Sequence, residues 1–201
     1  MILSPDTIIV LFVLIFGLIH SVLARDFAKE KLQIISNYRR FYILVSLLTL
    51  VLLILIEFNL ARQGTKIEVI IKNPPIGILF VFIGGFLFIG SMLQLRLSKG
   101  LEKNQLIKTG FFAFSRHPIY LGGIILLISM GLCFINNSVH MYFLLSLALY
   151  LFIGSLIEDY YLLRNVPEYP EYKKICGKYL PWRKKHIIYF FQNILPKKIK
   201  D

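Results

Sequence analysis

The chain has 201 residues, of which 57% are apolar, and it carries a formal net charge of +12. Its mean hydropathy of +0.69 is high for a soluble domain of this length, and the unalternated Leu, Ile and Phe runs exclude a β-barrel. The positive charge does not indicate nucleic acid, because the basic residues crowd the ends of the apolar runs, as expected beside anionic lipid headgroups.

Five apolar segments approach the ~20 residues that an α-helix needs to cross the hydrocarbon core of a membrane. They are residues 6–24, 41–56, 76–97, 118–135 and 141–157. The second, fourth and fifth are short, so we expect interfacial aromatic and basic residues to extend their ends. The first has no basic residues before it and no clear cleavage site after it, which favours a retained helix over a signal peptide. The sequence thus predicts an all-α integral membrane protein of about five transmembrane helices, with residues 1–201 forming one membrane domain.

The Lys and Arg residues are concentrated in alternate links between these segments. Twenty of the 23 lie in the first link, the third link and the C-terminal tail; the fourth link has none, and the second has only Arg62, Lys66 and Lys72. Because cytoplasmic loops carry the excess of Lys and Arg, the N-terminus is predicted to lie outside and the tail in the cytoplasm. Residues 160–201 form this basic tail, which we expect to be amphipathic and to lie on anionic lipid.

The fourth link, FINNSVH, is too short for a domain, so the fourth and fifth segments must form an antiparallel hairpin. This hairpin brings Arg116 and His117 to the same side of the membrane as Glu158 and Asp159. Pro118 suits the first turn of a helix, where its missing N–H has no partner in any case. Arg116 and His117 then sit at the positive end of that helix. Free N–H groups and a guanidinium there attract a carboxylate or a phosphate.

Residues on either side of this start extend the cluster. Tyr120 follows His117 by about one helical turn and points to a similar face, and Gly122 with Gly123 permits close approach by a neighbouring helix or a ligand. Cys133 and Cys176 have neither a CxxC partner nor a local His cluster, so no disulfide framework or zinc site is expected.

The segment LIKTGFFAFSRHPIYLGG resembles the RHPxYxG signature of the isoprenylcysteine carboxyl methyltransferase superfamily, including its upstream TGxxxxxRHP approach. The segment EDYYLLRNVPEYPEYKKICGKYLPW is similar to a second motif of that superfamily: two acids, a leucine three residues on, a Tyr-xx-Tyr pair and a closing proline. Both motifs lie within residues 106–182, which the resemblance implies to be a cofactor-binding core.

The resemblance implies an S-adenosylmethionine-dependent methyltransferase whose cofactor pocket faces the cytoplasm. It implies cofactor contact by Lys108, Thr109, Gly110, His117, Pro118, Tyr120, Gly122, Glu158 and Asp159. We also expect His117 and Arg116 to take part in catalysis. The carboxylate and amine of such a cofactor suit a positive helix end beside acids, and positioning matters most in an in-line methyl transfer.

The N-terminal segment FGLIHSVLARDFAKEKL resembles the first helix of the methanethiol S-methyltransferase branch. It is also similar to a related family of membrane proteins associated with nitric-oxide metabolism, and both have an HSxxA stretch. His20 and Ser21 then lie about one turn inside the cytoplasmic boundary, where they can line the same cavity as His117. His20 is therefore a third candidate for catalysis.

One departure from the family pattern bears on the methyl acceptor. Carboxyl-methylating members carry an arginine four residues before the acidic pair, where this chain has Gly154. This difference favours a neutral or thiol acceptor over an isoprenylcysteine-type carboxylate within the expected class of small lipophilic acceptors. The other expected partners are membrane lipids with anionic headgroups, without nucleic acid. Abundant Lys, Ile and Asn favour a bacterial source, and so an inner membrane.

Two other functions remain open at this stage. One is an NADPH-dependent reductase related to the sterol reductases, although the chain is short for that class. The other is a non-catalytic membrane protein associated with nitric-oxide or respiratory metabolism, which has no need for an intact acidic pair.

Overall fold

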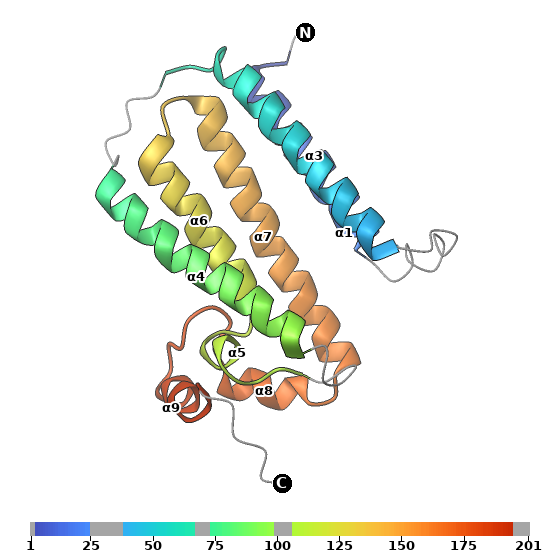
Figure 1. Cartoon of the computed structure of the whole chain (residues 1–201), viewed down its shortest axis with the longest axis vertical. Coiled ribbons are helices and arrows are strands. Elements are labelled where there is room, and N and C mark those ends of the chain that lie inside the picture. Colours follow the sequence, from blue (N-terminus) through green and yellow to red (C-terminus); the bar gives the residue numbers. More distant parts are fainter. Residues whose placement is uncertain (1–2, 25–37, 67–72, 99–105, 195–201) are drawn as a thin grey trace. The chain divides into compact units, whose positions relative to one another are not determined.

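The computed structural model describes residues 3–24, 38–66, 73–98 and 106–194, and the described part is helical without a β-strand (Figure 1). The long helices are α1 (Pro5–Leu23), α3 (Tyr38–Ala61), α4 (Pro74–Ser98), α6 (Pro118–Phe134) and α7 (Ser138–Asn165). The short helices are α5 (Phe111–Phe114), α8 (Tyr169–Ile175) and α9 (Lys184–Asn193). Four of the long helices are long and apolar enough to cross a membrane, and α6 is a shorter apolar helix. The predicted all-α membrane fold is confirmed.

Helices α3 and α7 extend beyond the apolar segments predicted for them. Helix α3 has 24 residues and includes Glu57, while α7 has 28 residues and includes His140. Glu57 is buried, and its Oε1 lies 2.7 Å from His140 Nδ1. This pairing compensates for burying polar groups inside the helical bundle. The segments predicted from hydropathy alone are therefore shorter than both helices, because they leave out Glu57 and His140.

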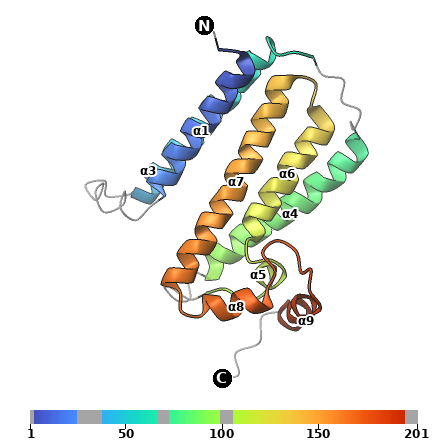
Figure 2. The same cartoon turned by 180° about the vertical axis from the view of Figure 1, so that it is seen from behind.

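The chain divides into two compact units, residues 1–72 with 134–150, and residues 73–133 with 151–201. In the first unit, α1 packs along α3 (Figure 2). Ser4 caps α1 by accepting the N–H of Thr7 at 3.2 Å, and Ser138 at the start of α7 donates to Asp6 Oδ1 at 2.7 Å. The expectation of one membrane domain stays a prediction.

In the second unit, α4 and α6 approach each other closely at a pair of glycines. A Cβ atom at Gly122 would lie 2.5 Å from the backbone nitrogen of Phe88 and 2.9 Å from the carbonyl oxygen of Gly84. On another side of α6, Tyr120 packs against Gly154 of α7, where a Cβ atom would lie 3.0 Å from the phenol ring. The close approach expected at Gly122 is therefore to helix α4.

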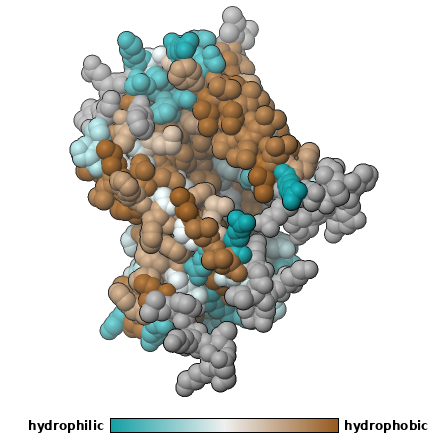
Figure 3. Space-filling model, in the orientation of Figure 1, coloured by the Kyte–Doolittle hydropathy of each residue, from teal (hydrophilic) through white to brown (hydrophobic). Residues whose placement is uncertain are grey.

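The long helices present apolar side chains outward. On α3, Leu44, Leu47, Leu48 and Val51 are all exposed. Figure 3 shows a brown, hydrophobic surface over the place of α3 in Figure 1. Contiguous apolar surface of this extent is disfavoured in water. It suits the acyl chains of a membrane.

The short helices α5, α8 and α9 gather at the end of the second unit where α6 begins and α7 ends (Figure 1). Gly110 precedes α5 with a φ of 60°, and its N–H donates to the carbonyl of Asn193 at 3.0 Å. Tyr189 of α9 donates to the carbonyl of Lys108 at 2.7 Å, and the Tyr179 hydroxyl lies 2.5 Å from Ser155 Oγ. These two tail tyrosines thus fasten the tail to its own unit, and the contact of the tail with lipid stays a prediction.

Candidate active site

Asp159 is buried near the end of α7, and three donors converge on its Oδ1 atom. His117 Nε2 lies 2.9 Å away and Arg116 Nη1 lies 3.3 Å away, while the Tyr169 hydroxyl donates a hydrogen bond. Lys173 Nζ lies 3.8 Å from the other carboxylate oxygen. The structure therefore brings together the two polar ends that the sequence placed on one side of the membrane.

The hydrogen bond to Asp159 determines which nitrogen of His117 carries the proton. An ionised carboxylate only accepts, so Nε2 must donate, and in a neutral ring Nδ1 then has a free lone pair. That Nδ1 lies 3.8 Å from Glu158 Oε2. The Glu158 side chain is 44% exposed, and the Asp159 side chain only 12%. His117 therefore lies between one open acid and one enclosed acid, with the ring of Tyr120 at 5.8 Å from its own.

The C-terminal tail covers the start of α6. Helix α6 begins at Pro118, as predicted. The N–H groups of Arg116 and His117 donate to the carbonyls of Gly177 and Lys178, at 3.0 and 3.3 Å. These two donors are therefore engaged by the protein, although the sequence suggested free N–H groups for a ligand at this helix end.

The segment from Lys108 to Gly110 joins three parts of the second unit. Lys108 Nζ forms an ion pair with Glu168, and the carbonyl of Thr109 accepts from Gln94 Nε2 at 2.8 Å. With the bonds to α9 described above, the polar groups of this segment hold α4, α8 and α9 together. Its contact with a cofactor stays a prediction.

His20 belongs to a separate polar cluster in the first unit. Its Nε2 lies 2.8 Å from the Tyr42 hydroxyl and its Nδ1 lies 3.1 Å from Ser46 Oγ. Ser21 Oγ, next in the chain, lies 3.3 Å from the hydroxyl of Tyr150. Both ring nitrogens of His20 thus have hydroxyl partners within the unit. Whether His20 and His117 line one cavity stays a prediction, because they belong to different units.

Tyr169 and its neighbours on α8 were not assigned a role from the sequence. Tyr169, Tyr172 and Cys176 form a buried cluster, in which the Tyr172 hydroxyl donates to the carbonyl of Phe112. Burial and the bond to Asp159 raise the pKa of Tyr169, and burial raises the pKa of the Cys176 thiol to about 11. Cys176 is therefore a protonated structural thiol. The Tyr-xx-Tyr spacing puts both rings on one helix face, and this pattern could have predicted from the sequence that the two rings share a buried cluster.

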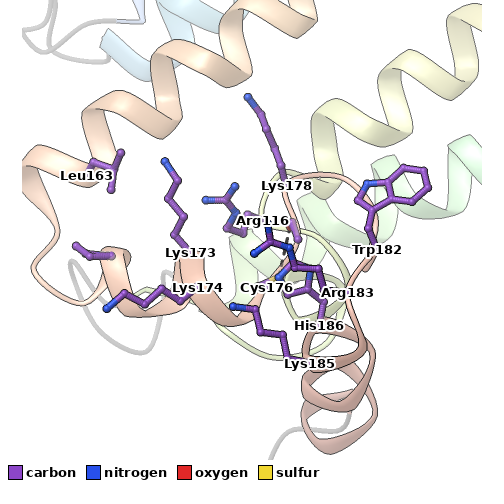
Figure 4. A pocket seen from close by; sticks show the side chains of 12 residues that line it. Arg116, Leu163, Lys173, Lys174, Cys176, Lys178, Trp182, Arg183, Lys185 and His186 are labelled. Atoms are coloured by element: carbon purple, nitrogen blue, oxygen red, sulfur yellow. Dashed lines mark hydrogen bonds between the residues drawn. The ribbon is translucent and has the colours of Figure 1, made fainter.

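A cavity of about 590 Å³ adjoins this cluster (Figure 4). Its wall comes from α7 through Leu163, from α8, the following segment and α9, and from the side chain of Arg116. Of the residues predicted for the site, Arg116 is the one that lines it. Lys173, Lys178, Arg183 and His186, which also line it, were not predicted as site residues.

Residues 79–162 match the family model described as the isoprenylcysteine carboxyl methyltransferase (ICMT) family. The matched segment runs from α4 to α7 and includes Arg116, His117, Glu158 and Asp159. It ends before Tyr169 and the tail. Comparison with curated proteins gave no match, and comparison with solved structures gave none.

Proposed function

We propose that this chain, whose residues 79–162 match the model of the isoprenylcysteine carboxyl methyltransferase family, transfers a methyl group from S-adenosylmethionine to a small lipophilic acceptor. The observation that best supports the proposal is the position of His117 between Asp159 at 2.9 Å and Glu158 at 3.8 Å. In this arrangement the imidazole can accept a proton, and the open carboxylate beside it can bind a cationic ligand.

The residues at this site fit the charge of the cofactor. S-adenosylmethionine carries a sulfonium and an ammonium against one carboxylate, so an acid must face it. Asp159 Oδ1 already receives two hydrogen bonds and the Arg116 ion pair, whereas Glu158 has an exposed side chain that lies 3.8 Å from His117 Nδ1. Glu158 is therefore the acid that would hold the cationic part of the cofactor, with Tyr120 and His117 beside it.

S-adenosylmethionine supplies a methyl group bonded to a positively charged sulfur, and an acceptor displaces that sulfur in line. A thiol acceptor must lose its proton, because the thiolate is the nucleophile. His117 Nδ1 is the group suited to take that proton, since Asp159 holds the proton of Nε2. Glu158 and Asp159 then both stabilise the resulting imidazolium. A carboxylate acceptor would need no such base.

The surroundings of Gly154 support a thiol acceptor over a carboxylate. A Cβ atom at this position would lie 3.0 Å from the Tyr120 ring, so the ring already occupies the space in which the arginine of carboxyl-methylating relatives would begin. Without that arginine, the chain lacks the cation expected to hold a carboxylate acceptor at this position.

The distribution of Lys and Arg supports a site that faces the cytoplasm of a bacterial inner membrane. The residues around His117 follow the basic third link, and the basic tail covers them. On the cytoplasmic side the cofactor reaches the site from the aqueous phase, and a lipophilic acceptor reaches it from the membrane.

Equilibrium binding of S-adenosylmethionine to the detergent-purified chain, measured by calorimetry, tests this proposal. We expect saturable binding at one site, lost in His117→Ala and weakened at least about tenfold in Glu158→Gln, where one charge-assisted contact is removed. Glu171→Gln, which removes the same charge from an exposed position on α8, serves as the matched control and keeps wild-type affinity. Absence of binding by the folded chain, or saturable NADPH binding in its place, overturns the proposal.

A further inference from the structure

The cavity beside Arg116 is lined by basic side chains from most of the segments that form it, while α7 contributes Leu163. Arg116 comes from the start of α6, and the others come from α8, α9 and the segments that flank α9: Lys173, Lys174, Lys178, Arg183, Lys185 and His186. No Asp or Glu side chain is among the described residues that line it. In Figure 4 the nitrogen ends of Lys173 and Arg116 appear near each other, and the side chain of Lys178 extends above them.

Three of the six Lys and Arg residues that line the cavity have an ion pair within the protein, among them Arg116 with Asp159 at 3.3 Å. Lys174 pairs with Glu171 at 2.6 Å, and Lys173 approaches Asp159 at 3.8 Å. Lys178, Arg183 and Lys185 have no ion pair with any residue that the structure describes. A concave surface lined by one sign of charge concentrates the electrostatic potential and attracts counter-ions.

Three residues that line the cavity have buried nitrogens without hydrogen-bond partners among the described residues. The Arg116 side chain is only 6% exposed, yet neither its Nε nor its Nη1 has a hydrogen-bond partner within the described ranges. Nη1 lies 3.3 Å from Asp159 but outside hydrogen-bond geometry. Lys178 Nζ and His186 Nδ1 are likewise buried and unpartnered. A buried donor left unsatisfied costs about 1–3 kcal/mol, so the donors of Arg116 and Lys178 suit a ligand with several acceptor oxygens.

The charge of the cavity does not match S-adenosylmethionine, which is itself net positive. It matches a phosphate group. Trp182, which also lines the cavity, is 78% exposed, and Phe191 on α9 is exposed as well. Indole and phenyl rings exposed beside Lys and Arg are typical of the membrane interface, where basic pockets bind anionic headgroups.

We propose that this cavity binds the phosphate of one anionic phospholipid headgroup, held by Arg116, Lys178 and Arg183. The site is discrete, with one lipid for each chain, and is distinct from the general attraction of a basic tail to anionic lipid. Burial lowers the pKa of both Lys178 and His186. A bound anion would raise both pKa values again, because it favours the charged forms. The inference does not depend on methyl transfer.

The sole tryptophan of the chain, Trp182, reports on the cavity from its wall. The full-length chain in neutral detergent is titrated with short-chain phosphatidylglycerol, with the matched phosphatidylcholine, and with inorganic phosphate, while Trp182 fluorescence and binding heat are followed. We expect saturable one-to-one binding of phosphatidylglycerol and none of phosphatidylcholine. If inorganic phosphate also binds, the phosphate group alone is recognised. If inorganic phosphate does not bind, the acyl chains of the lipid also contribute to binding. Both results support a phosphate site.

Variants separate this site from non-specific charge and from the cofactor. The double variant Lys178→Gln, Arg183→Gln should weaken phosphatidylglycerol binding by about tenfold or more, since each cation near a lipid surface contributes measurably. Lys184→Gln removes one charge from α9 outside the cavity and should change affinity less than about twofold. No saturable binding, an equal loss in Lys184→Gln, or complete displacement by S-adenosylmethionine overturns the proposal. The last result would make the cavity part of the cofactor site and would leave the proposed methyltransferase function standing.

Discussion

Two neighbouring acids at the end of α7 have different surroundings. Asp159 is enclosed by Arg116, His117 and Tyr169, whereas the Glu158 side chain is 44% exposed. A carboxylate that already accepts two hydrogen bonds and pairs with a guanidinium fixes the groups around it and has little capacity left for a ligand. We therefore expect Asp159 to act as a positioning residue and Glu158 to contact the cofactor.

Conservative amide substitutions distinguish these roles. Asp159→Asn leaves the buried Arg116 guanidinium without a counter-charge, so it should lower stability by about 3 kcal/mol. Glu158→Gln should leave the melting temperature nearly unchanged and weaken S-adenosylmethionine binding. Thermal unfolding in detergent and calorimetry measure the two effects separately. Equal losses of stability in both variants would contradict the assignment.

At the scale of helices, the contact between α4 and α6 depends on a residue without a side chain. A Cβ atom at Gly122 would meet the Phe88 backbone at 2.5 Å, and backbone cannot move aside as a flexible side chain can. The neighbouring glycine on α4 differs, because a Cβ atom at Gly85 meets nothing within 4 Å.

The two glycines make a matched test of this contact. Gly122→Ala should push α6 away from α4 and destabilise the chain by about 1–3 kcal/mol, as overpacking does. Gly85→Ala should be neutral or stabilise α4 by up to about 1 kcal/mol, since Ala favours helix. Melting temperatures of the two variants in the same detergent provide the comparison. A tolerated Gly122→Ala would show that α4 and α6 do not pack as described.

The buried cluster of Tyr169, Tyr172 and Cys176 should make the tail less stable at alkaline pH. Burial raises the pKa of Cys176 from 9.0 to about 11, so the unfolded chain releases this proton at lower pH than the folded chain does. Stability is therefore complete below about pH 9 and falls as the pH rises toward 11, by about 3 kcal/mol from this thiol. Unfolding between pH 8 and 11 measures the loss. Cys176→Ala removes this thiol, so its stability should fall less over that range; an identical fall would contradict the prediction.

Hydropathy and link length predicted much of this architecture, but not the folding of the tail. The five apolar segments and the short FINNSVH link were enough to bring His117 opposite Asp159, because a hairpin leaves no other arrangement. The bonds from Arg116 and His117 to Gly177 and Lys178 run through an irregular segment with no periodic signal. The cavity lining follows from that segment, so sequence patterns could not predict it.

At the scale of the whole molecule, the distribution of Lys and Arg predicts the orientation of the chain. Gln63 in the second link should lie outside, and Lys184 on α9 should lie in the cytoplasm. Single cysteines at these exposed positions, in a chain lacking Cys133 and Cys176, can be labelled with a membrane-impermeant maleimide. We expect Gln63→Cys to react in intact cells and Lys184→Cys to react only after permeabilisation. The reverse pattern would invert the topology and move the site to the outer face.

The central claim is that the cluster around His117 supports methyl transfer from S-adenosylmethionine. Its most direct test is the transfer of a tritiated methyl group, in membranes containing the chain, to methanethiol, longer thiols and farnesylcysteine derivatives. We predict labelled thiol products that fall at least about tenfold in Glu158→Gln and further in His117→Ala, where the proton acceptor is lost. Folded wild-type chain that labels no acceptor in the panel, or labels one equally well in both variants, would contradict the claim.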